Sequence, residues 1–343
     1  MKKVSVCVPT YNRPEMVGQL IKTYLYQDYP NRELVISDDS SNDSVERVTM
    51  SFNDPSIKYF KNSENLGYCE NLLVALERAT GDYIVILGDD DLLLKENTLS
   101  RYARTFDEND ETYYIYCNSV QISNDLKVDL LRHYFSEDTY INKGKEAMCS
   151  IWLYSTFIPG MGLRNKIPFR ALYPDHTMLY PQVEMVGHII NTYDSYGLSD
   201  FLVAGRAHDE QLGFKAVLGE RVKGGELHGN VEIYQIFEYL KDKYSLDLDD
   251  TFISVHQIRA YMEIMLKEKM FLGNKYIKLN YRNFCEMSDV ARRSLKLKAS
   301  YYIALVLPGW AIGVIRFFYL KKRSFRDREL IKQVDADLAR KLL

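Results

Sequence analysis

The sequence predicts a doubly wound α/β fold with a mostly parallel sheet, because short apolar strands alternate with helical segments through its first hundred residues. These alternating segments are, in order, a strand at 3–8, a helix at 15–27, a strand at 33–37, a helix at 44–50, a strand at 57–60, a helix at 68–79 and a strand at 83–87. Polar loops rather than two-residue hairpin turns follow the strands. Parallel strands with right-handed crossovers are therefore expected.

The first strand and helix illustrate the local signals behind this assignment. The strand is rich in β-branched residues and ends at Pro9, which cannot donate to a sheet ladder. Asn12 can cap the next helix, and Pro14 suits its first turn. Apolar residues then recur at helical spacing, at Met16, Val17, Leu20, Ile21, Tyr24 and Leu25.

Two of the predicted strands end in clustered carboxylates. Asp38 and Asp39 follow the strand at 33–37, and Gly88 with Asp89–Asp91 follows the strand at 83–87. The carboxyl ends of parallel strands share one edge of the sheet, where open α/β folds bind ligands. Neighbouring carboxylates repel one another, so Mg²⁺ or Mn²⁺ is an expected cofactor, and acidic turns that begin helices are the alternative. Neither a GxGxxG nor a GxxxxGK[ST] motif is present, which disfavours Rossmann dinucleotide and P-loop sites.

The composition describes a globular chain large enough for one large or two ordinary domains. It has 343 residues, of which 46% are hydrophobic and 27% charged, and its net charge of -3 gives no push toward nucleic acid. Five cysteines without CxxC spacing argue against a disulfide framework and a zinc site. The N-terminus enters a strand at once, without a signal-peptide h-region, so a cytoplasmic protein is expected.

The second half changes character. Amphipathic helical patterns without strand alternation begin near residue 226, so we expect a domain at 1–225 and a helical region at 226–343. Residues 301–320 are the most apolar stretch, interrupted by Pro308-Gly309, and residues 292–326 hold nine lysines and arginines and no acidic residue. This pattern predicts an interfacial segment on an anionic membrane, with a buried helix as the alternative. The charged helix at 327–343 is a candidate for self-association into a homo-oligomer.

Four segments in this order resemble the family 2 glycosyltransferases of the GT-A fold. They are VSVCVPTYNRP, ELVISDDSSND, NLGYCEN and GDYIVILGDDD, and together they cover roughly residues 3 to 100. The resemblance implies a nucleotide-diphosphate sugar donor bound by a donor half at about 1–100, with an acceptor half at about 101–225. The family's common metal motif is Asp-x-Asp-Asp, a DXD motif, whereas this chain has Gly88 at the first aspartate.

The resemblance also assigns candidate site residues. The predicted donor-binding residues are Pro9, Thr10, Tyr11, Arg13, Asp39, Asn65, Gly67, Asn71 and Asp89. The predicted metal ligands are Asp90, Asp91 and, on the pattern of a late histidine in some GT-A enzymes, His208. Arg206 is an alternative contact to the diphosphate. The general base is expected at Glu184, with Asp175 or His176 as alternatives.

The sequence therefore predicts an inverting, metal-dependent glycosyltransferase. The resemblance implies direct displacement at the anomeric carbon, because a divalent ion stabilises the diphosphate leaving group while a base takes the acceptor proton. The expected acceptor is a glycan or polyprenyl-linked glycan of a bacterial capsule, O-antigen or other surface polysaccharide, met at the inner face of the plasma membrane. A silent nucleotide-sugar-binding module and a nucleotidyltransferase are the alternatives.

Overall fold

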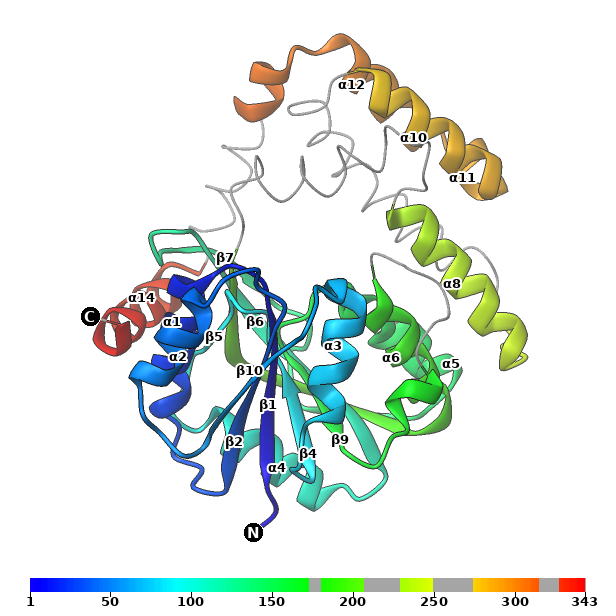
Figure 1. The fold of residues 1–343 in the computed structure, drawn as a ribbon. Coiled ribbons are helices and arrows are strands. Elements are labelled where there is room, and N and C mark those ends of the chain that lie inside the picture. The colour runs from blue at the N-terminus through cyan, green and yellow to red at the C-terminus, as the bar shows by residue number, and fades with distance from the viewer. Residues whose placement is uncertain (173–179, 207–228, 249–273, 315–326, 343) are drawn as a thin grey trace. The chain divides into compact units, whose positions relative to one another are not determined.

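The structure is a computed structural model that describes residues 1–172, 180–206, 229–248, 274–314 and 327–342 (Figure 1). Contacts divide the chain into two compact units, one made of residues 1–206 and 327–343 and the other of residues 207–326. The expected boundary near residue 225 lies outside the described residues. The last helix, which the sequence grouped with the C-terminal helical region, belongs by its contacts to the first unit.

A ten-stranded sheet forms the centre of the first unit. Its strands are β1 (Val4–Thr10), β2 (Arg32–Asp38), β3 (Ile57–Lys61), β4 (Tyr83–Ile86), β5 (Leu92–Leu93), β6 (Thr112–Ile122), β7 (Val128–Arg132), β8 (Thr139–Ile141), β9 (Met161–Arg164) and β10 (Asp194–Arg206). The main path runs β3-β2-β1-β4-β9-β6-β10-β5, with β7 beside β6 and β8 beside β10.

The first four strands are parallel, as the sequence predicted. β1 pairs in parallel with both β2 and β4, and β2 pairs in parallel with β3. The sheet then departs from a simple parallel order, because β9 runs antiparallel between β4 and β6. β6 and β10 form a second long parallel pair.

Helices of the first unit cover both faces of the sheet. They are α1 (Pro14–Leu25), α2 (Ser44–Ser51), α3 (Gly67–Glu77), α4 (Thr98–Glu108), α5 (Lys145–Ser150), α6 (Pro181–Thr192) and α14 (Arg328–Leu342), with 3-10 turns η1 (Trp152–Thr156) and η2 (Phe169–Leu172).

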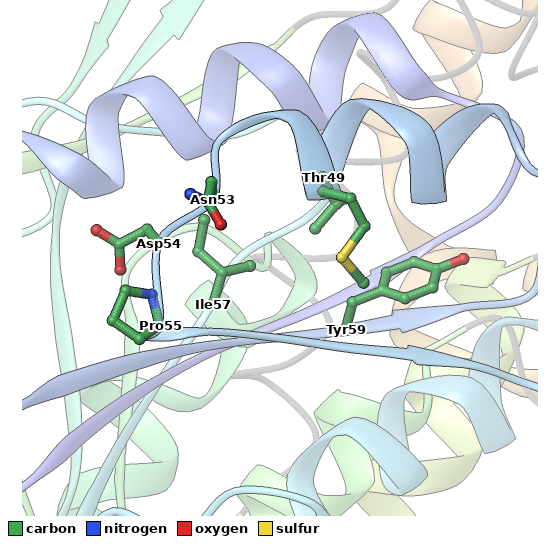
Figure 2. A pocket seen from close by; sticks show the side chains of 7 residues that line it. Thr49, Asn53, Asp54, Pro55, Ile57 and Tyr59 are labelled. Atoms are coloured by element: carbon green, nitrogen blue, oxygen red, sulfur yellow. The ribbon is translucent and has the colours of Figure 1, made fainter.

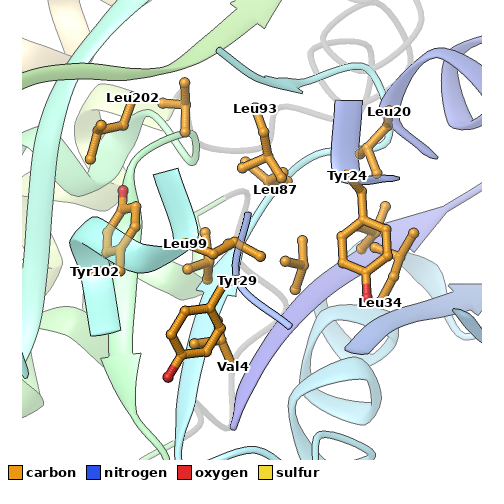
Figure 3. Close-up of a cluster of buried hydrophobic side chains, with 14 of the residues drawn as sticks. Val4, Leu20, Tyr24, Tyr29, Leu34, Leu87, Leu93, Leu99, Tyr102 and Leu202 are labelled. Atoms are coloured by element: carbon orange, nitrogen blue, oxygen red, sulfur yellow. The ribbon is translucent and has the colours of Figure 1, made fainter. Parts of the chain in front are cut away.

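The core explains why the early strands are apolar at nearly every position. Val4, Val6 and Val8 pack with α1 and α4 in one buried cluster (Figure 3). Cys7, between them in the sequence, points to the opposite face, where its thiol contacts the Ala75 carbonyl of α3 at 3.5 Å. Side chains of a strand alternate between faces, and both faces are covered here, so apolar residues predominate on both, while the buried Ser5 is paired with the Glu33 carboxylate.

The C-terminal helix α14 closes the apolar side of β5 and its neighbours. Val334, Leu338 and Leu342 pack against an apolar cluster that includes Leu92, Leu94, Val120, Ile122, Leu131 and Ala204. The buried Lys341 amine donates to the Leu94 carbonyl oxygen. Lys22 of α1 donates to the Leu342 carbonyl oxygen at 2.9 Å, which fixes the end of the helix.

The second unit is described by α8 (Gly229–Lys243), α10 (Asn274–Met287), α11 (Asp289–Arg293) and α12 (Leu295–Val306). α12 ends before Pro308, and a further helical stretch occupies 309–314, so the break expected at Pro308-Gly309 is present. Among the helices in the described residues, none combines the length and apolar character that a bilayer crossing requires.

We predict that Leu338→Ala lowers the free energy of unfolding by about 2–5 kcal/mol, because Leu338 is buried and its truncation leaves a cavity beside β5. Denaturant unfolding of the full chain measures this change. Gln333→Ala, at an exposed position of the same helix, is the matched control and should leave stability nearly unchanged. Equal stability of Leu338→Ala and Gln333→Ala would show that α14 does not dock as described.

Candidate functional site

The acidic loop, Gly88–Asp91, lies at the carboxyl end of β4 beside the end of β1. Its turn is held from within, because the Asp91 carboxylate accepts the Gly88 backbone N–H at 2.6 Å. It is also held by β1, since the Thr10 hydroxyl donates to the Asp89 carboxylate at 2.9 Å. All three carboxylates are buried. The sequence prediction that these groups gather at the carboxyl edge of the sheet is therefore confirmed for this loop.

Arg13 supplies positive charge to the acidic loop. Its guanidinium lies 3.0 Å from the Asp89 carboxylate and 3.5 Å from that of Asp90. Burial acts to lower the pKa of Arg13, but the acidic neighbours, Asp89 foremost, outweigh it and raise that pKa. Burial raises the pKa of Asp89, and Arg13 opposes this rise. Arg13 thus brings one positive charge to a loop of three carboxylates, and Arg206 of β10 brings a second.

When all three carboxylates are ionised, the negative charge of the loop exceeds what Arg13 and Arg206 together balance. Burial raises the pKa of Asp91 well above its ordinary range, and the charge of Asp90 raises it further. Carboxylates in this state gain stability from another cation. The donor set is therefore chemically suited to a hard divalent ion.

Geometry limits how such an ion would be held. In the described part of the chain, no three or more His, Cys, Asp or Glu side chains are arranged as a metal site. Asp89 is engaged by Thr10 and Arg13, and one Asp91 oxygen is engaged by Gly88. A divalent ion held by one or two carboxylates and completed by ligand phosphates and water fits this arrangement.

Arg206 approaches the acidic loop from the last residue of β10. Antiparallel pairing of β5 with β10 sets Leu92 opposite Ala204, which brings the end of β10 beside the loop. The Arg206 guanidinium lies 3.4 Å from the Asp90 carbonyl oxygen and donates to the Gln19 amide oxygen at 2.6 Å. Burial lowers the pKa of Arg206, and Asp90 and Asp91 oppose that effect. Sequence reasoning named Arg206 only as an alternative, because β10 itself was not predicted.

Asp39 is positioned by a buried amide pair. The Asn62 side chain donates to the Asp39 carboxylate at 2.6 Å and to the Asn71 side-chain oxygen at 3.0 Å. The Asn71 amide donates in turn to the Ser37 carbonyl oxygen at 3.1 Å. Asn71, predicted at the donor site, thus ties the ends of β1 and β2 together, and Asn62 is a site residue that sequence reasoning missed. A polar residue at the end of a predicted strand was the available signal.

Exposed groups line the same edge of the sheet. Tyr11 and Tyr68 are 48% and 41% exposed, so both rings are accessible to a ligand, whereas Pro9 is buried in β1. Asn65 and Gly67 form the exposed turn that begins α3, and the Asn65 side chain accepts the Gly67 N–H at 2.9 Å. Gly67 has a φ of 76°, which favours glycine.

The predicted base, Glu184, lies in the first turn of α6. It is buried, and its carboxylate lies 3.7 Å from the His188 imidazole one turn later. The hydroxyl of Tyr68, beside the N-terminus of α3, donates to the Gln182 side chain at 3.5 Å, so the start of α6 lies next to the start of α3. The alternatives Asp175 and His176, and the metal candidate His208, lie outside the described residues and stay predictions.

Trp152 serves packing beneath the predicted base. Trp152 is fully buried in η1, and its indole N–H donates to the Val183 carbonyl oxygen of α6 at 3.0 Å. Trp152 thereby supports the first turn of α6, which carries Glu184.

A small pocket elsewhere does not belong to this site. It has a volume of about 220 Å³ and is lined by Thr49, Met50, Asn53, Asp54, Pro55, Ile57 and Tyr59 (Figure 2). These residues come from the end of α2, the loop that follows it and β3, and β3 is an edge strand of the sheet. Residues 53–57 lie at the amino end of β3, away from the carboxyl edge that carries the acidic loop.

Comparison with known proteins gives a consistent picture. Residues 5–172 match the model of the family described as Glycosyl transferase family 2. The chain is 26% identical to the abequosyltransferase RfbV of Salmonella typhimurium over 316 residues, which cover 86% of this chain and 89% of that protein. It is 38% identical over 97 residues to a GalNAc(5)-diNAcBac-PP-undecaprenol beta-1,3-glucosyltransferase of Campylobacter jejuni, covering 27% of this chain and 31% of that protein. Several curated relatives, this one included, are thus matched over about a third of their length.

Solved structures agree on the fold. The S. aureus TarS 1-349 structure in complex with UDP-GlcNAc has a TM-score of 0.57 at 16% identity, covering 95% of this chain and 92% of that chain. The mannosyltransferase PcManGT from Pyrobaculum calidifontis, in complex with GDP-Man and Mn²⁺, has a TM-score of 0.50 at 14% identity, covering 99% of this chain and 86% of that chain. The family model, the relatives and the solved structures agree with one another. Residues 5–172 therefore form a family 2 glycosyltransferase domain, and the fold is GT-A.

Proposed function

We propose that this glycosyltransferase moves a sugar, with inversion, from a nucleotide-diphosphate donor to a glycan or polyprenyl-linked acceptor in bacterial surface-polysaccharide synthesis. The observation that carries the proposal is the meeting of Asp39, Arg13 and the acidic loop at one edge of the sheet. Such an edge offers a hydrogen-bond acceptor for a base and opposite charges for a diphosphate. Relatives named as abequosyltransferase and as acting on undecaprenol-linked glycans support the substrate class.

In this proposal the donor half binds the nucleotide. Asp39, held by Asn62, accepts a hydrogen bond from the base, and the exposed Tyr11 ring packs beside it. The exposed turn at Asn65 and Gly67 lies toward the ribose and diphosphate. Asn71 supports this arrangement by donating hydrogen bonds to backbone carbonyl oxygens at the ends of both β1 and β2.

In this proposal the charged groups at the acidic loop stabilise the diphosphate leaving group. Asp90 is the first candidate ligand for Mg²⁺ or Mn²⁺, and Asp91 is the second. When bound, the ion would stabilise the negative charge that develops on the diphosphate. Arg13 and Arg206 add fixed positive charge beside the loop without reorganising, since neighbouring groups already hold both side chains. Asp89 orients Arg13 through their 3.0 Å contact.

Glu184 is the proposed general base for the acceptor hydroxyl. Its burial at the start of α6 restricts its rotamers, and the nearby His188 gives it a polar partner. Proton removal by a positioned carboxylate contributes about 10²–10⁴-fold to such reactions. A lipid-linked acceptor would be met at the inner face of the plasma membrane, and self-association through residues 327–343 remains a prediction.

The donor site is tested by nucleotide-induced stabilisation. We expect one of UDP, TDP, CDP or GDP, with Mn²⁺ present, to raise the melting temperature, because a ligand of the native state stabilises it by about 2.7 kcal/mol at a hundredfold excess over Kd. EDTA and Asp90→Asn should each abolish the metal-dependent part. Asp110→Asn, at an exposed site, is the matched control. If the nucleotide-induced stabilisation is unchanged both by EDTA and by Asp90→Asn, the metal assignment is wrong.

Replacement of the base should separate chemistry from binding. We expect Glu184→Gln to lower kcat about 10²–10⁴-fold while the affinity for the nucleotide stays unchanged, because the amide cannot accept the proton. Transfer assays and nucleotide titrations measure the two quantities. Glu108→Gln, at an exposed position of α4, is the control. Full activity of Glu184→Gln would show that Glu184 is not the base and would favour Asp175 or His176. Nucleotide binding by the wild-type protein without any turnover would favour a silent binding module.

Gly88 is a testable departure from the family pattern. A Cβ at Gly88 would lie 2.9 Å from an Asp90 carboxylate oxygen and 3.0 Å from one of Asp91, closer than side chains pack. We expect Gly88→Ala to weaken metal-dependent nucleotide binding about tenfold or more, since overpacking costs about 1–3 kcal/mol. Gly88→Asp, which restores the common motif, should weaken binding further because its larger side chain meets the same Asp90 and Asp91 carboxylate oxygens. Gly18→Ala, where a Cβ meets only Val48, is the control. Tighter binding by Gly88→Asp would refute this account.

A further inference from the structure

The second unit carries a row of exposed apolar side chains, which we call the apolar face. It consists of Leu295, Tyr302, Ile303, Val306, Trp310 and Val314. Val306 and Trp310 are 81% and 76% exposed, far more than a packed side chain would be. The surfaces of soluble proteins usually scatter such residues singly, so six of them within twenty residues of sequence point to an interaction site.

Among the described residues of the second unit, the apolar face takes no part in the buried cluster. α12 uses its opposite side for that purpose, where Leu297 and Ala304 are buried in a cluster with Ile277 and Phe284 of α10. The rings of Tyr281 and Tyr301 stack there at 3.9 Å. Positions 295, 302 and 306 repeat at helical spacing on the outer side. α12 is therefore apolar on both sides, and α10 covers only one of them.

Basic residues flank the apolar face. Arg292, Arg293, Lys296 and Lys298 are all exposed, and the sequence from Arg292 to Val314 contains no acidic residue. Arg292 forms an ion pair with Asp289, which precedes this stretch. Exposed apolar side chains beside a segment that carries only positive charges are complementary to an anionic, amphipathic surface.

We propose that the apolar face and its basic flank bind the surface of an anionic lipid bilayer. Exposed apolar rings and chains would enter the interfacial region, where tryptophan is favoured, while the lysines and arginines meet the headgroups. The twelve residues of α12 are too few to span a bilayer, so the segment lies on the surface. A second copy of the chain is a poorer occupant, because a twofold contact would bring two basic flanks together. This inference rests on the proposed function in one respect only, namely which membrane the protein binds.

Vesicle flotation of the full chain, without donor or acceptor, tests this surface. We expect binding to vesicles of phosphatidylcholine and phosphatidylglycerol in equal parts, and much weaker binding to phosphatidylcholine alone. The double variant Lys296→Gln/Lys298→Gln should weaken binding about fivefold for each charge removed. Val306→Ser/Trp310→Ser should also weaken it, and added salt should reduce wild-type binding.

Matched controls are exposed residues on the first unit. Arg47→Gln/Lys58→Gln removes two basic charges, and Met50→Ser removes an exposed apolar side chain. Neither should alter flotation. Equal binding to both vesicle types, or equal effects of controls and test variants, would overturn the proposal. So would a wild-type dimer that floats with neither vesicle and becomes monomeric in Val306→Ser/Trp310→Ser. Nucleotide-induced stabilisation, measured separately, reports whether the donor site itself has failed.

Discussion

The balance of charge around the acidic loop is the constraint on which the donor site depends. Three buried carboxylates share one turn, and Arg13 contacts two of them while Arg206 closes on the backbone beside Asp90. Most of the neighbouring structure fixes these partners in place: Thr10 at the end of β1, the pairing of β5 with β10, and α14 behind β5. A loop with surplus negative charge in a buried setting is well prepared for a cation and a diphosphate.

Local signals predicted the donor half well. Strands 3–8, 33–37, 57–60 and 83–87 each correspond to an observed strand. Three of them, β1, β2 and β4, are buried almost throughout and show apolar runs that few other elements share, whereas β3 is a partly exposed edge strand. The position of the carboxylates at two strand ends was predictable as well. Once the strands are known to be parallel, their carboxyl ends lie at the same edge of the sheet. The family resemblance then supplied roles that spacing alone does not provide.

The second half of the sheet was harder to predict. β9 has four residues, and β5 has two, so neither carries enough pattern to be seen in sequence. β10 contains thirteen residues with irregular pairing to β6, and its glycines and polar residues hide the alternation of a strand. Asn62 and Arg206 were underestimated because their roles come from long-range contacts, to Asp39 and to Asp90.

The order of the two units along the chain has a practical consequence for dissecting the enzyme. The chain leaves the first unit after Arg206 and returns to it at Asp327, so the second unit is an insertion rather than an appended tail. Truncation from the C-terminus would remove α14 and uncover the apolar residues around Leu92 and Leu131. Isolating the first unit therefore calls for excision of residues 207–326 and a linker from residue 206 to residue 327, which would keep the final helix in place.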